Sequence, residues 1–428
     1  MKRDKCQIVE LVASYLAPIG VALFLLVQPL PGQTFSVIHD FTNGSDGGNP
    51  VTGLTVAGTD TFYGTARTGG STNNGLVFKL SHRGSGWVLV PIYTFQGGMD
   101  GANPFAAAAI GPDGRLYGTT ENGGGGNCSG FGSGCGTIYA LAPSANASGN
   151  ALGSWTETVL YRFQGGYDGA DPFGMLVFDR AGNAYGTTQI GGSSTQCLPA
   201  GTGCGTAYEL SGAGDNWAKT ILWSFGHGFD GVEPFNGLQF DTSGNLYGTT
   251  FVGGTDQDGT IFELSPSGSD WTESVLYSVT DGTDGGLPYT AVIFDSQGNL
   301  ITPTSDGGSG AGGTVVQLTK SGNSWQFNLL YSLTNPAEAE CGPFGTLLMG
   351  SAGNLYGTTR CDGANRLGSV FELSPTQDGW VYSTLHDFSG SDGQNPYSSL
   401  VIDSDGNLFG TTLLGGQYGQ GVVFEITP

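Results

Sequence analysis

Residues 217–264 contain the pattern from which we infer the architecture. They run W-A-K-T-I-L-W-S-F, G-H-G-F-D-G-V-E-P, F-N-G-L-Q-F-D, T-S-G-N-L-Y-G-T-T, F-V-G-G-T-D-Q-D and G-T-I-F-E-L. Four apolar runs of strand length are separated by turn residues, which predicts four short strands. We name them strand A (P-F-x-G-L-x-F-D), strand B (N-L-Y-G-T-T), strand C (G-T-V-F-E-L) and strand D (W-x-x-T-V-L-Y-S-F). The D-x-x-G-N sequence between A and B predicts a hairpin, because Asp bonds the backbone two residues on and Gly supplies a positive φ.

The same unit recurs along the chain. Its Y-G-T-T element begins at Tyr63, Tyr117, Tyr185, Tyr247, Ile301, Tyr356 and Phe409, with the variant I-T-P-T at Ile301. Four antiparallel strands in each repeat of about 55 residues are typical of a β-propeller blade. The sequence therefore predicts an all-β, seven-bladed β-propeller of four-stranded antiparallel blades, a single domain over residues 34–428.

The two ends of the repeat region are out of phase. Phe35–Phe41 reads as a strand D with no A, B or C before it, and Val422–Ile426 reads as a strand C with no D after it. Pairing of these two segments completes the seventh blade and leaves no open sheet edge. We therefore expect the N-terminal strand to close the ring by completing the last blade.

The amino-acid composition agrees with an all-β protein and excludes other classes of protein. Gly accounts for 78 of the 428 residues, and charged residues make up only 11%. Helical and coiled-coil proteins need more Glu, Lys, Arg and Ala than this chain has. Collagen needs glycine at every third position, and a hydrophobic share of 38% is too high for a disordered linker.

The net charge of −23 narrows the set of partners. It argues against nucleic acid, whose phosphates require clustered Lys and Arg, and against an anionic membrane surface. Neutral or cationic ligands remain compatible, which leaves a carbohydrate or protein ligand open. Solubility through self-repulsion explains the charge without any ligand and is the simpler interpretation.

Residues 1–33 are expected to direct export. Lys2, Arg3 and Lys5 form a positive segment, and Leu16–Val27 is apolar and precedes helix-breaking residues. The apolar segment is short for a membrane span, which favours a cleaved signal peptide over an uncleaved N-terminal anchor. Only in the uncleaved case would the protein touch a membrane. The predicted location is secreted, extracellular or at the cell surface or periplasm.

The repeat motifs resemble those of the GloVer tandem repeat family, named for Gloeobacter and Verrucomicrobia. The resemblance rests on the D-G-x-x-P, G-N-L-Y-G-T-T and G-T-V-F-x-L elements, which recur in order over about residues 35–428. It implies an exported, propeller-like repeat protein. It brings no settled activity and no catalytic residues to carry over.

Six cysteines follow the predicted signal, an even number that suggests disulfides in an exported chain. The candidate short-range pairs are Cys128 with Cys135 and Cys197 with Cys204. Cys341 lies in a D-to-A loop, and Cys361 begins the B-to-C loop of the same blade. Because both loops rise on one face beside neighbouring strands, we expect a third bridge there. Neither short spacing is C-x-x-C and no His is close, so no zinc site is predicted.

The D-to-A loops share an Asp followed by Gly. These residues are Asp46, Asp100, Asp168, Asp230, Asp284 and Asp392. Six carboxylates on one face form a candidate ligand-binding mouth, with Ca²⁺ as the cofactor that they would suit. The favoured alternative is that each Asp caps its own turn through an Asx-type bond, in which case no metal and no cofactor is involved.

An aromatic residue follows the Pro of strand A in six of the seven repeats. These residues are Phe105, Phe173, Phe235, Tyr289, Phe344 and Tyr397, and Val51 is the exception. A ring of aromatics around a channel mouth can stack on sugar faces, whereas packing between adjacent blades is the simpler interpretation and is favoured. The Trp that opens strand D in six repeats and the paired Thr of Y-G-T-T are interpreted as structural.

One repeat departs most from the pattern. At 337–343 it replaces D-G-x-x-P with A-E-A-E-C-G-P, and it also holds two of the few basic residues of the chain. A function usually breaks repeat symmetry, so Glu338, Glu340, Arg360 and Arg366 form a second candidate ligand-binding patch. Ordinary surface drift is the alternative.

No catalytic constellation stands out. His39 and His386 are each followed by Asp, but neighbours on a strand point to opposite faces and do not pair as in a triad. The sequence therefore predicts an exported propeller that acts as a non-catalytic binding or scaffold module, with glycan binding as its sharper form. The alternative is a polysaccharide hydrolase or lyase that uses the face formed by the D-to-A and B-to-C loops.

Overall fold

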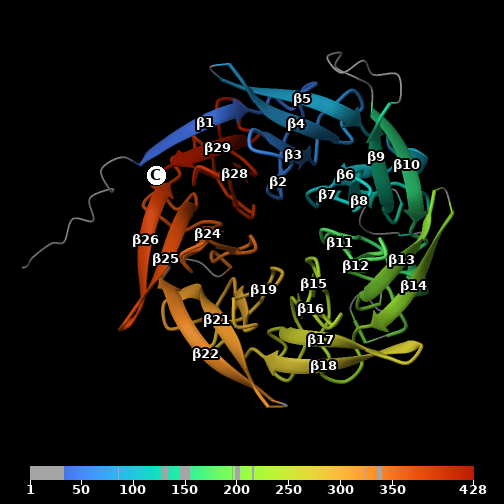
Figure 1. The fold of residues 1–428 in the computed structure, drawn as a ribbon, viewed down its shortest axis with the longest axis vertical. Helices are drawn as coiled ribbons and strands as arrows, with labels where there is room; N and C mark the ends of the chain where they lie inside the picture. Colours follow the sequence, from blue (N-terminus) through green and yellow to red (C-terminus); the bar gives the residue numbers. More distant parts are fainter. Residues whose placement is uncertain are drawn as a thin grey trace, which may run out of the picture.

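In the computed structural model, seven antiparallel sheets surround a central axis as the blades of a propeller (Figure 1). The structure describes residues 33–428, apart from 85, 127, 129–133, 145–154, 195, 198–202, 215, 323 and 335–339. Residues 1–32 of the predicted export signal and Glu338 of the candidate patch thus lie outside the described residues. The predicted fold class, blade number and strand count per blade are confirmed.

Each blade follows the predicted A-B-C-D order from the axis outward. The A strands are β2 (Thr55–Val56), β7 (Ala109–Ile110), β11 (Val177–Phe178), β15 (Gln239–Phe240), β19 (Ile293–Phe294), β23 (Leu348–Met349) and β27 (Val401–Ile402). The B strands are β3 (Thr61–Ala66), β8 (Leu116–Asn122), β12 (Ala184–Thr188), β16 (Leu246–Thr250), β20 (Leu300–Pro303), β24 (Leu355–Thr359) and β28 (Leu408–Thr412).

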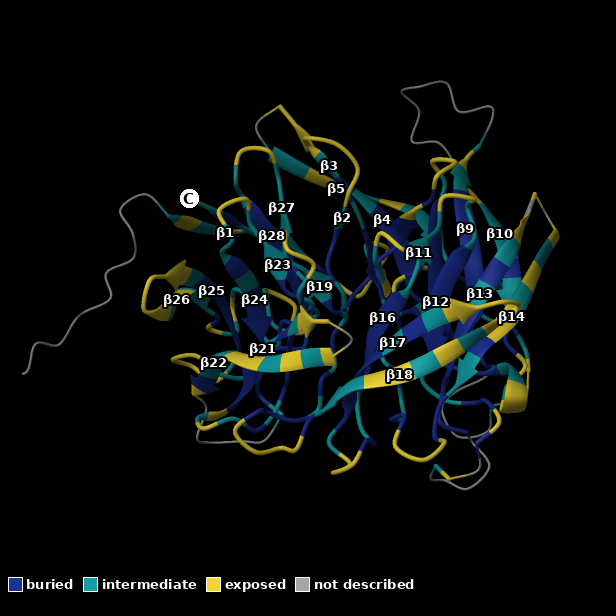
Figure 2. Ribbon diagram, turned by 60° about the horizontal axis from the view of Figure 1, so that its bottom comes forward, coloured by how far each residue is buried: buried dark blue, intermediate teal, exposed yellow. Residues whose placement is uncertain are grey.

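The longer strands lie farther out. The C strands are β4 (Leu76–Arg83), β9 (Thr137–Pro143), β13 (Thr206–Ala213), β17 (Thr260–Ser267), β21 (Ala311–Ser321), β25 (Ser369–Thr376) and β29 (Val422–Thr427). The D strands are β5 (Gly86–Thr94), β10 (Trp155–Arg162), β14 (Asn216–Ser224), β18 (Asp270–Ser278), β22 (Ser324–Thr334), β26 (Gly379–Asp387) and β1 (Thr34–Asp40). Exposed residues recur along outer strands such as β18 and β22 (Figure 2), so these strands form the solvent side of their blades.

The ring closes between the two ends of the chain, as predicted. Strand β1 pairs antiparallel with β29, with Phe35 opposite Ile426 and Val37 opposite Phe424. Phe41, which follows β1, is completely buried among residues of the first blade, including Phe62. The N-terminal segment therefore completes the last blade and also packs against the first.

The hydrophobic core is divided among the blade interfaces. Seven clusters of buried side chains are found among the described residues, and each joins two neighbouring blades. Tyr247 of Y-G-T-T shows how the motif serves this packing, because its ring lies 6.1 Å from that of Trp325 in the next blade. Gly248 is required by close approach: a Cβ there would lie 2.7 Å from the ring of Phe262.

The two Thr residues of the motif bond in different directions. The Thr249 hydroxyl donates to the backbone carbonyl of Thr290 in the next blade, at 2.7 Å. The Thr250 and Thr260 hydroxyls lie 2.8 Å apart within one blade. One Thr thus links blades and the other links strands B and C, which is the structural role predicted for the pair.

The D-to-A and B-to-C loops pair with each other on one face of the ring. Gly48 bridges Thr68, and Val232 bridges Val252. In the second blade the same contact extends to a short strand, β6 (Ala102–Pro104), which pairs with β8. Two D-to-A loops contain single 3₁₀ turns, η1 (Gly98–Asp100) and η2 (Gly166–Asp168). We call this face of the ring the loop face.

None of the helices in the described part of the chain has the length and apolar character needed to cross a bilayer.

Candidate functional site

The six Asp side chains of the D-G loops bond within their own loop and the strand before it, and Asp168 also pairs with Lys219 of β14 at 3.0 Å. Each accepts a backbone N–H from the start of its loop; the donors are Thr42, Gln96, Gln164, Gly226, Thr280 and Ser389. Each also contacts a ring of strand D, namely that of His39, Tyr93, Tyr161, Trp223, Tyr277 or His386. The carboxylates therefore serve their own turns, as the favoured interpretation expects.

The same six residues do not converge. No group of three His, Cys, Asp or Glu side chains among the described residues is arranged to hold a metal ion. Ring symmetry spreads the six loops around the rim of the loop face, and a ligand site requires side chains that meet. Ligand binding by these Asp residues stays a prediction, and the structure directs attention to other side chains.

Three disulfides lie on the loop face, in the pairs that were predicted. Cα atoms are 5.3 Å apart in Cys128–Cys135 and 5.4 Å apart in Cys197–Cys204, and both bridges close B-to-C loops. In the third bridge, the Cα atoms of Cys341 and Cys361 are 4.8 Å apart. It joins the D-to-A loop to the B-to-C loop of one blade, where the Asp-Gly turn is missing.

The second candidate patch is partly assembled. Arg360 Nη1 lies 3.9 Å from Glu340 Oε2 and donates to the Glu340 carbonyl at 3.4 Å. Arg366 lies in the following turn with φ of 58°, and no ion pair involves it within the described ranges. The structure thus brings together two members of the patch, and it places Arg360 against a feature that the sequence indicated separately.

That feature is a collar of aromatic rings around the central axis. Consecutive rings from six neighbouring blades have centroids 4.5, 5.6, 4.8, 4.8 and 5.0 Å apart, in the order Phe105, Phe173, Phe235, Tyr289, Phe344 and Tyr397. Adjacent blades therefore pack through these rings, as the favoured interpretation expected. The same rings also line a cavity, which sugar stacking, the alternative interpretation, requires, so the two are not exclusive.

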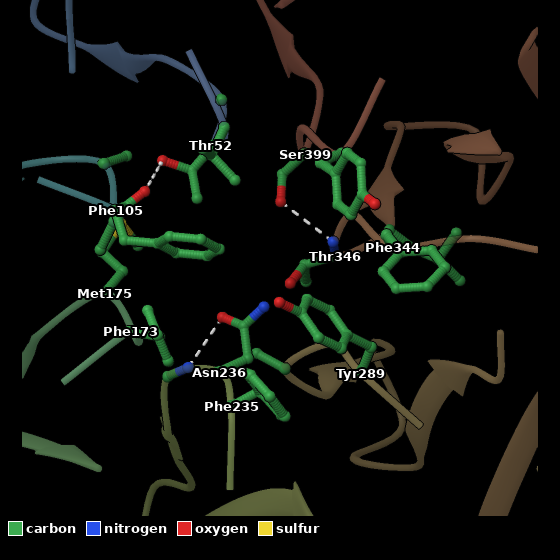
Figure 3. Close-up of a pocket in the computed structure, with 18 of the residues that line it drawn as sticks. Thr52, Phe105, Phe173, Met175, Phe235, Asn236, Tyr289, Phe344, Thr346 and Ser399 are labelled. Carbon is green, nitrogen blue, oxygen red and sulfur yellow. Dashed lines mark hydrogen bonds between the residues drawn. The ribbon is translucent and has the colours of Figure 1, made fainter. Parts of the chain in front are cut away.

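The cavity has a volume of about 270 Å³ and is lined by residues from all seven blades, some of which Figure 3 shows. Its lining is mainly apolar, with a small number of polar groups among the rings, such as Asn236, Tyr289, Thr346 and Ser399. Ser399 accepts the Thr346 backbone N–H at 3.0 Å. Concave, largely apolar sites with a few placed polar groups are typical of small-ligand binding.

Charged residues stand above the collar on the loop face. Arg67 and Glu121, from the first and second blades, form a two-pronged pair with nitrogen–oxygen distances of 2.9 and 3.0 Å. The Arg67 guanidinium lies 6.0 Å from the centroid of Phe105. Arg360 lies 5.4 Å from the centroid of Phe344 and 5.5 Å from that of Tyr397. Guanidinium groups thus cover two separate parts of the collar.

These charges act together on the cavity. Burial raises the pKa of the Tyr289 hydroxyl, and the charges of Arg67, Glu121 and Arg360 act on the same hydroxyl although they come from three other blades. Close to them, burial and the negative charge of Glu121 raise the pKa of Asp171 to about 7.

Sequence reasoning identified the collar positions and Arg360 but missed Arg67 and Glu121. All three charged residues occupy the position directly after Y-G-T-T, or Y-G-T-A in the first repeat. This position holds a different residue type in most repeats, although the motif before it is nearly constant. That contrast was the available signal.

One nucleophile–base contact exists outside the cavity. Ser193 Oγ lies 3.0 Å from His227 Nε2, and both residues are at the surface of the loop face. Asp230, the nearest carboxylate in sequence, accepts the His227 backbone N–H instead of the ring. Within the described residues the pair lacks the group that orients His in a triad.

Fold and site together define a closed, seven-bladed propeller with a ligand-sized cavity on its axis. A family model described as the Gloeobacter/Verrucomicrobia repeat matches residues 23–202, 198–341 and 273–428. The chain belongs to this repeat family, as the sequence motifs indicated. No curated protein sequence matches the chain.

Solved structures show the same architecture at low sequence identity. A polysaccharide lyase of family PL25, an ulvan lyase bound to -[GlcA(1-4)Rha3S]-, is 12% identical, with a TM-score of 0.52 over 92% of this chain and 95% of that chain. A fungal alcohol oxidase of the AA5 family, in complex with copper, is 14% identical, with a TM-score of 0.55 over 92% of this chain and 76% of that chain. At this level of identity the likeness concerns the fold alone.

Proposed function

We propose that this protein is a non-catalytic binding module that holds a carbohydrate in the axial cavity. The observation that carries the proposal is the collar, because six aromatic rings from neighbouring blades line one cavity. The C–H faces of sugars stack on such rings. The few polar groups between the rings are suited to fix hydroxyl groups.

Export is part of the proposal. Three disulfides on the loop face suit an oxidising compartment. The positive and apolar segments within residues 1–33 suit an export signal. Fractionation of cells that produce the full chain, and of cells that produce a chain without residues 1–33, tests this part; equal distribution of the two chains would count against it.

A glycan array identifies the ligand, and calorimetry then compares two matched variants. In Phe235→Leu the cavity loses a ring that contacts two others of the collar. We expect binding about five-fold weaker, since an aromatic contact contributes about 1 kcal/mol beyond buried area. Phe229→Leu removes a ring that is 62% exposed on the same face but outside the cavity, so its affinity should be unchanged.

Two outcomes would contradict the proposal. If the protein binds no glycan, the proposal has no basis. If both variants lose affinity to the same extent, the binding site lies outside the cavity. Release of shorter or unsaturated sugars during the assay would favour the alternative, a polysaccharide hydrolase or lyase at the loop face. The structural likeness to a polysaccharide lyase makes that measurement necessary.

A further inference from the structure

Within the described chain, the lining groups of the axial cavity that have no hydrogen-bond partner are mainly donors. Asn236 uses its Oδ1 to accept the Gly237 N–H at 2.7 Å, and its amide nitrogen points toward the centre of the cavity near the Tyr289 hydroxyl (Figure 3). Among the residues that the structure describes, neither Asn236 Nδ2 nor the Tyr289 hydroxyl has a hydrogen-bond partner. A ligand that satisfies these groups must present acceptors.

Arg360 adds the strongest unsatisfied donor. Its Nε is buried and has no partner in the described part of the chain. Its one hydrogen bond, to the Glu340 carbonyl, is long at 3.4 Å. Guanidinium groups present five donors in a planar fork that matches a carboxylate or a sulfate. Apart from Nη1, the donors of this fork have no hydrogen-bond partner among the described residues.

The backbone of Arg360, directly after β24, is held on both sides by hydrogen bonds. Its N–H donates to the Gly342 carbonyl, and its own carbonyl accepts from Asn395 Nδ2 at 3.2 Å. The next residue, Cys361, is bridged to Cys341. Only this blade has a disulfide between its D-to-A and B-to-C loops among the three bridges seen, so the arginine stands on an unusually constrained backbone.

The collar also has a gap, and the two arginines flank it. Val51 replaces the aromatic residue between Tyr397 and Phe105, and it lines the cavity. Arg360 covers the ring of Tyr397 at one end of the series, and Arg67 covers Phe105 at the other. Arg67 is paired closely with Glu121 at 2.8 Å, whereas the ion pair of Arg360 with Glu340 is long at 3.9 Å, so Arg360 is the less committed cation beside the gap.

We propose that the cavity selects acidic saccharides, and that Arg360 receives the carboxylate or sulfate of the bound sugar beside the gap at Val51. This inference rests on the proposed carbohydrate binding and names its ligand class. The chain as a whole carries a net charge of −23, so most of its surface repels an anion. Selection of an acidic sugar therefore depends on Arg360 and on the donors next to it.

The test uses an array in which each neutral glycan is paired with its uronate and its sulfate-ester counterpart. The full chain should retain an acidic member at least about ten-fold better than the neutral member of the same pair. Arg360→Gln should remove this preference while binding of the neutral member persists, which also shows that the variant is folded. Arg360→Lys should restore part of the preference, since it keeps the charge but loses the fork.

The matched control is Arg180→Gln. Arg180 is an exposed residue of the hairpin between strands A and B, at the opposite end of its blade from the loop face. The substitution makes the same change in net charge and should leave the preference intact. Whether the uronate or the sulfate ester is retained identifies the source of the anion.

The failures are distinguishable. If no glycan is retained, the proposed function is wrong. If neutral and acidic members bind equally, or if Arg360→Gln weakens both members to the same extent, carbohydrate binding stands and the selection by Arg360 is wrong. Loss of the preference in Arg180→Gln would assign it to overall charge and would also overturn the inference.

Discussion

Asp171 is a buried carboxyl at a position where other blades carry an amide. Asn49, Asn103 and Asn395 stand at the equivalent place in D-G-x-x-P, and each donates its Nδ2 to a backbone carbonyl of the preceding blade at 3.0–3.2 Å. Asp171 is 2% exposed, and its Oδ1 has no partner among the described residues. An ionised carboxylate has no proton to donate, so this blade lacks the bond that Asn49, Asn103 and Asn395 make.

Asp171→Asn is therefore expected to stabilise the protein. Folding raises the pKa of Asp171 from 3.8 to about 7. The stabilisation by its bound proton is complete below pH 3.8 and is lost as the pH rises to about 7. The variant should gain on the order of 1 kcal/mol in the free energy of unfolding above that pH and much less in acid.

Urea denaturation on both sides of this pH window measures the effect. Asp60→Asn serves as the control, because Asp60 is exposed and the substitution removes the same charge. Equal gains in the two variants, or a gain for Asp171→Asn that does not depend on pH, would contradict the assignment.

At the scale of the strand, the residue two positions after the Trp of strand D faces the preceding blade. In β14 this residue is Lys219, whose side chain is 2% exposed and whose Nζ lies 3.0 Å from Asp168 Oδ1. In β10 and β18 it is Glu157 and Glu273, and burial raises their pKa values to about 7 and about 8. The same strand position therefore holds a paired cation in one interface and an acid near neutrality in two others.

Lys219→Met should destabilise the protein by roughly 2–3 kcal/mol, because it leaves Asp168 without its buried partner. Methionine keeps most of the apolar stem among the rings that surround the lysine, so lost packing contributes little. Lys320→Met removes an exposed lysine from β21 and should change stability by less than about 0.5 kcal/mol. Thermal and urea unfolding of both variants test this, and similar values for the two would show that the ion pair is unimportant.

At the scale of the whole molecule, stability depends on closure of the ring. A chain that starts at residue 42 lacks β1 and Phe41, whereas a chain that starts at residue 33 keeps both. Burial of Phe41 alone, which is completely buried, contributes roughly 2–3 kcal/mol. The loss of β1 also exposes the edge of β29, which favours association.

The shorter chain should therefore melt at a lower temperature and associate in light scattering, while the longer one should melt as the full chain does. Equal melting temperatures for the two truncations would mean that closure contributes little to stability.

The architecture was predictable because every repeat contains the sequence signals for the same four strands and their turns. Seven copies of the same strand and turn signals fix the number of blades, and the unmatched segments at Phe35–Phe41 and Val422–Ile426 indicate how the ends meet. The family model supports the same assignment. Strand and turn signals of this kind are local, so they can be recognised without knowledge of the tertiary structure.

The candidate site was only partly predictable. The collar positions and Arg360 stood out from the repeat, but the choice between packing and ligand contact depends on the width of the axial cavity, which is a property of the closed ring. Arg67 and Glu121 meet only because neighbouring blades set their B-to-C loops side by side. Such contacts between repeats are not visible within any single repeat.

The gap at Val51 has a consequence for the statistics of binding. A ring of seven identical blades would offer an axial ligand seven equivalent rotational settings, a degeneracy that favours binding by about 1 kcal/mol. One aliphatic residue in the collar and one open arginine beside it remove that degeneracy. A ligand bound in the proposed site would thus lose this small entropic gain and be held in a single rotational setting.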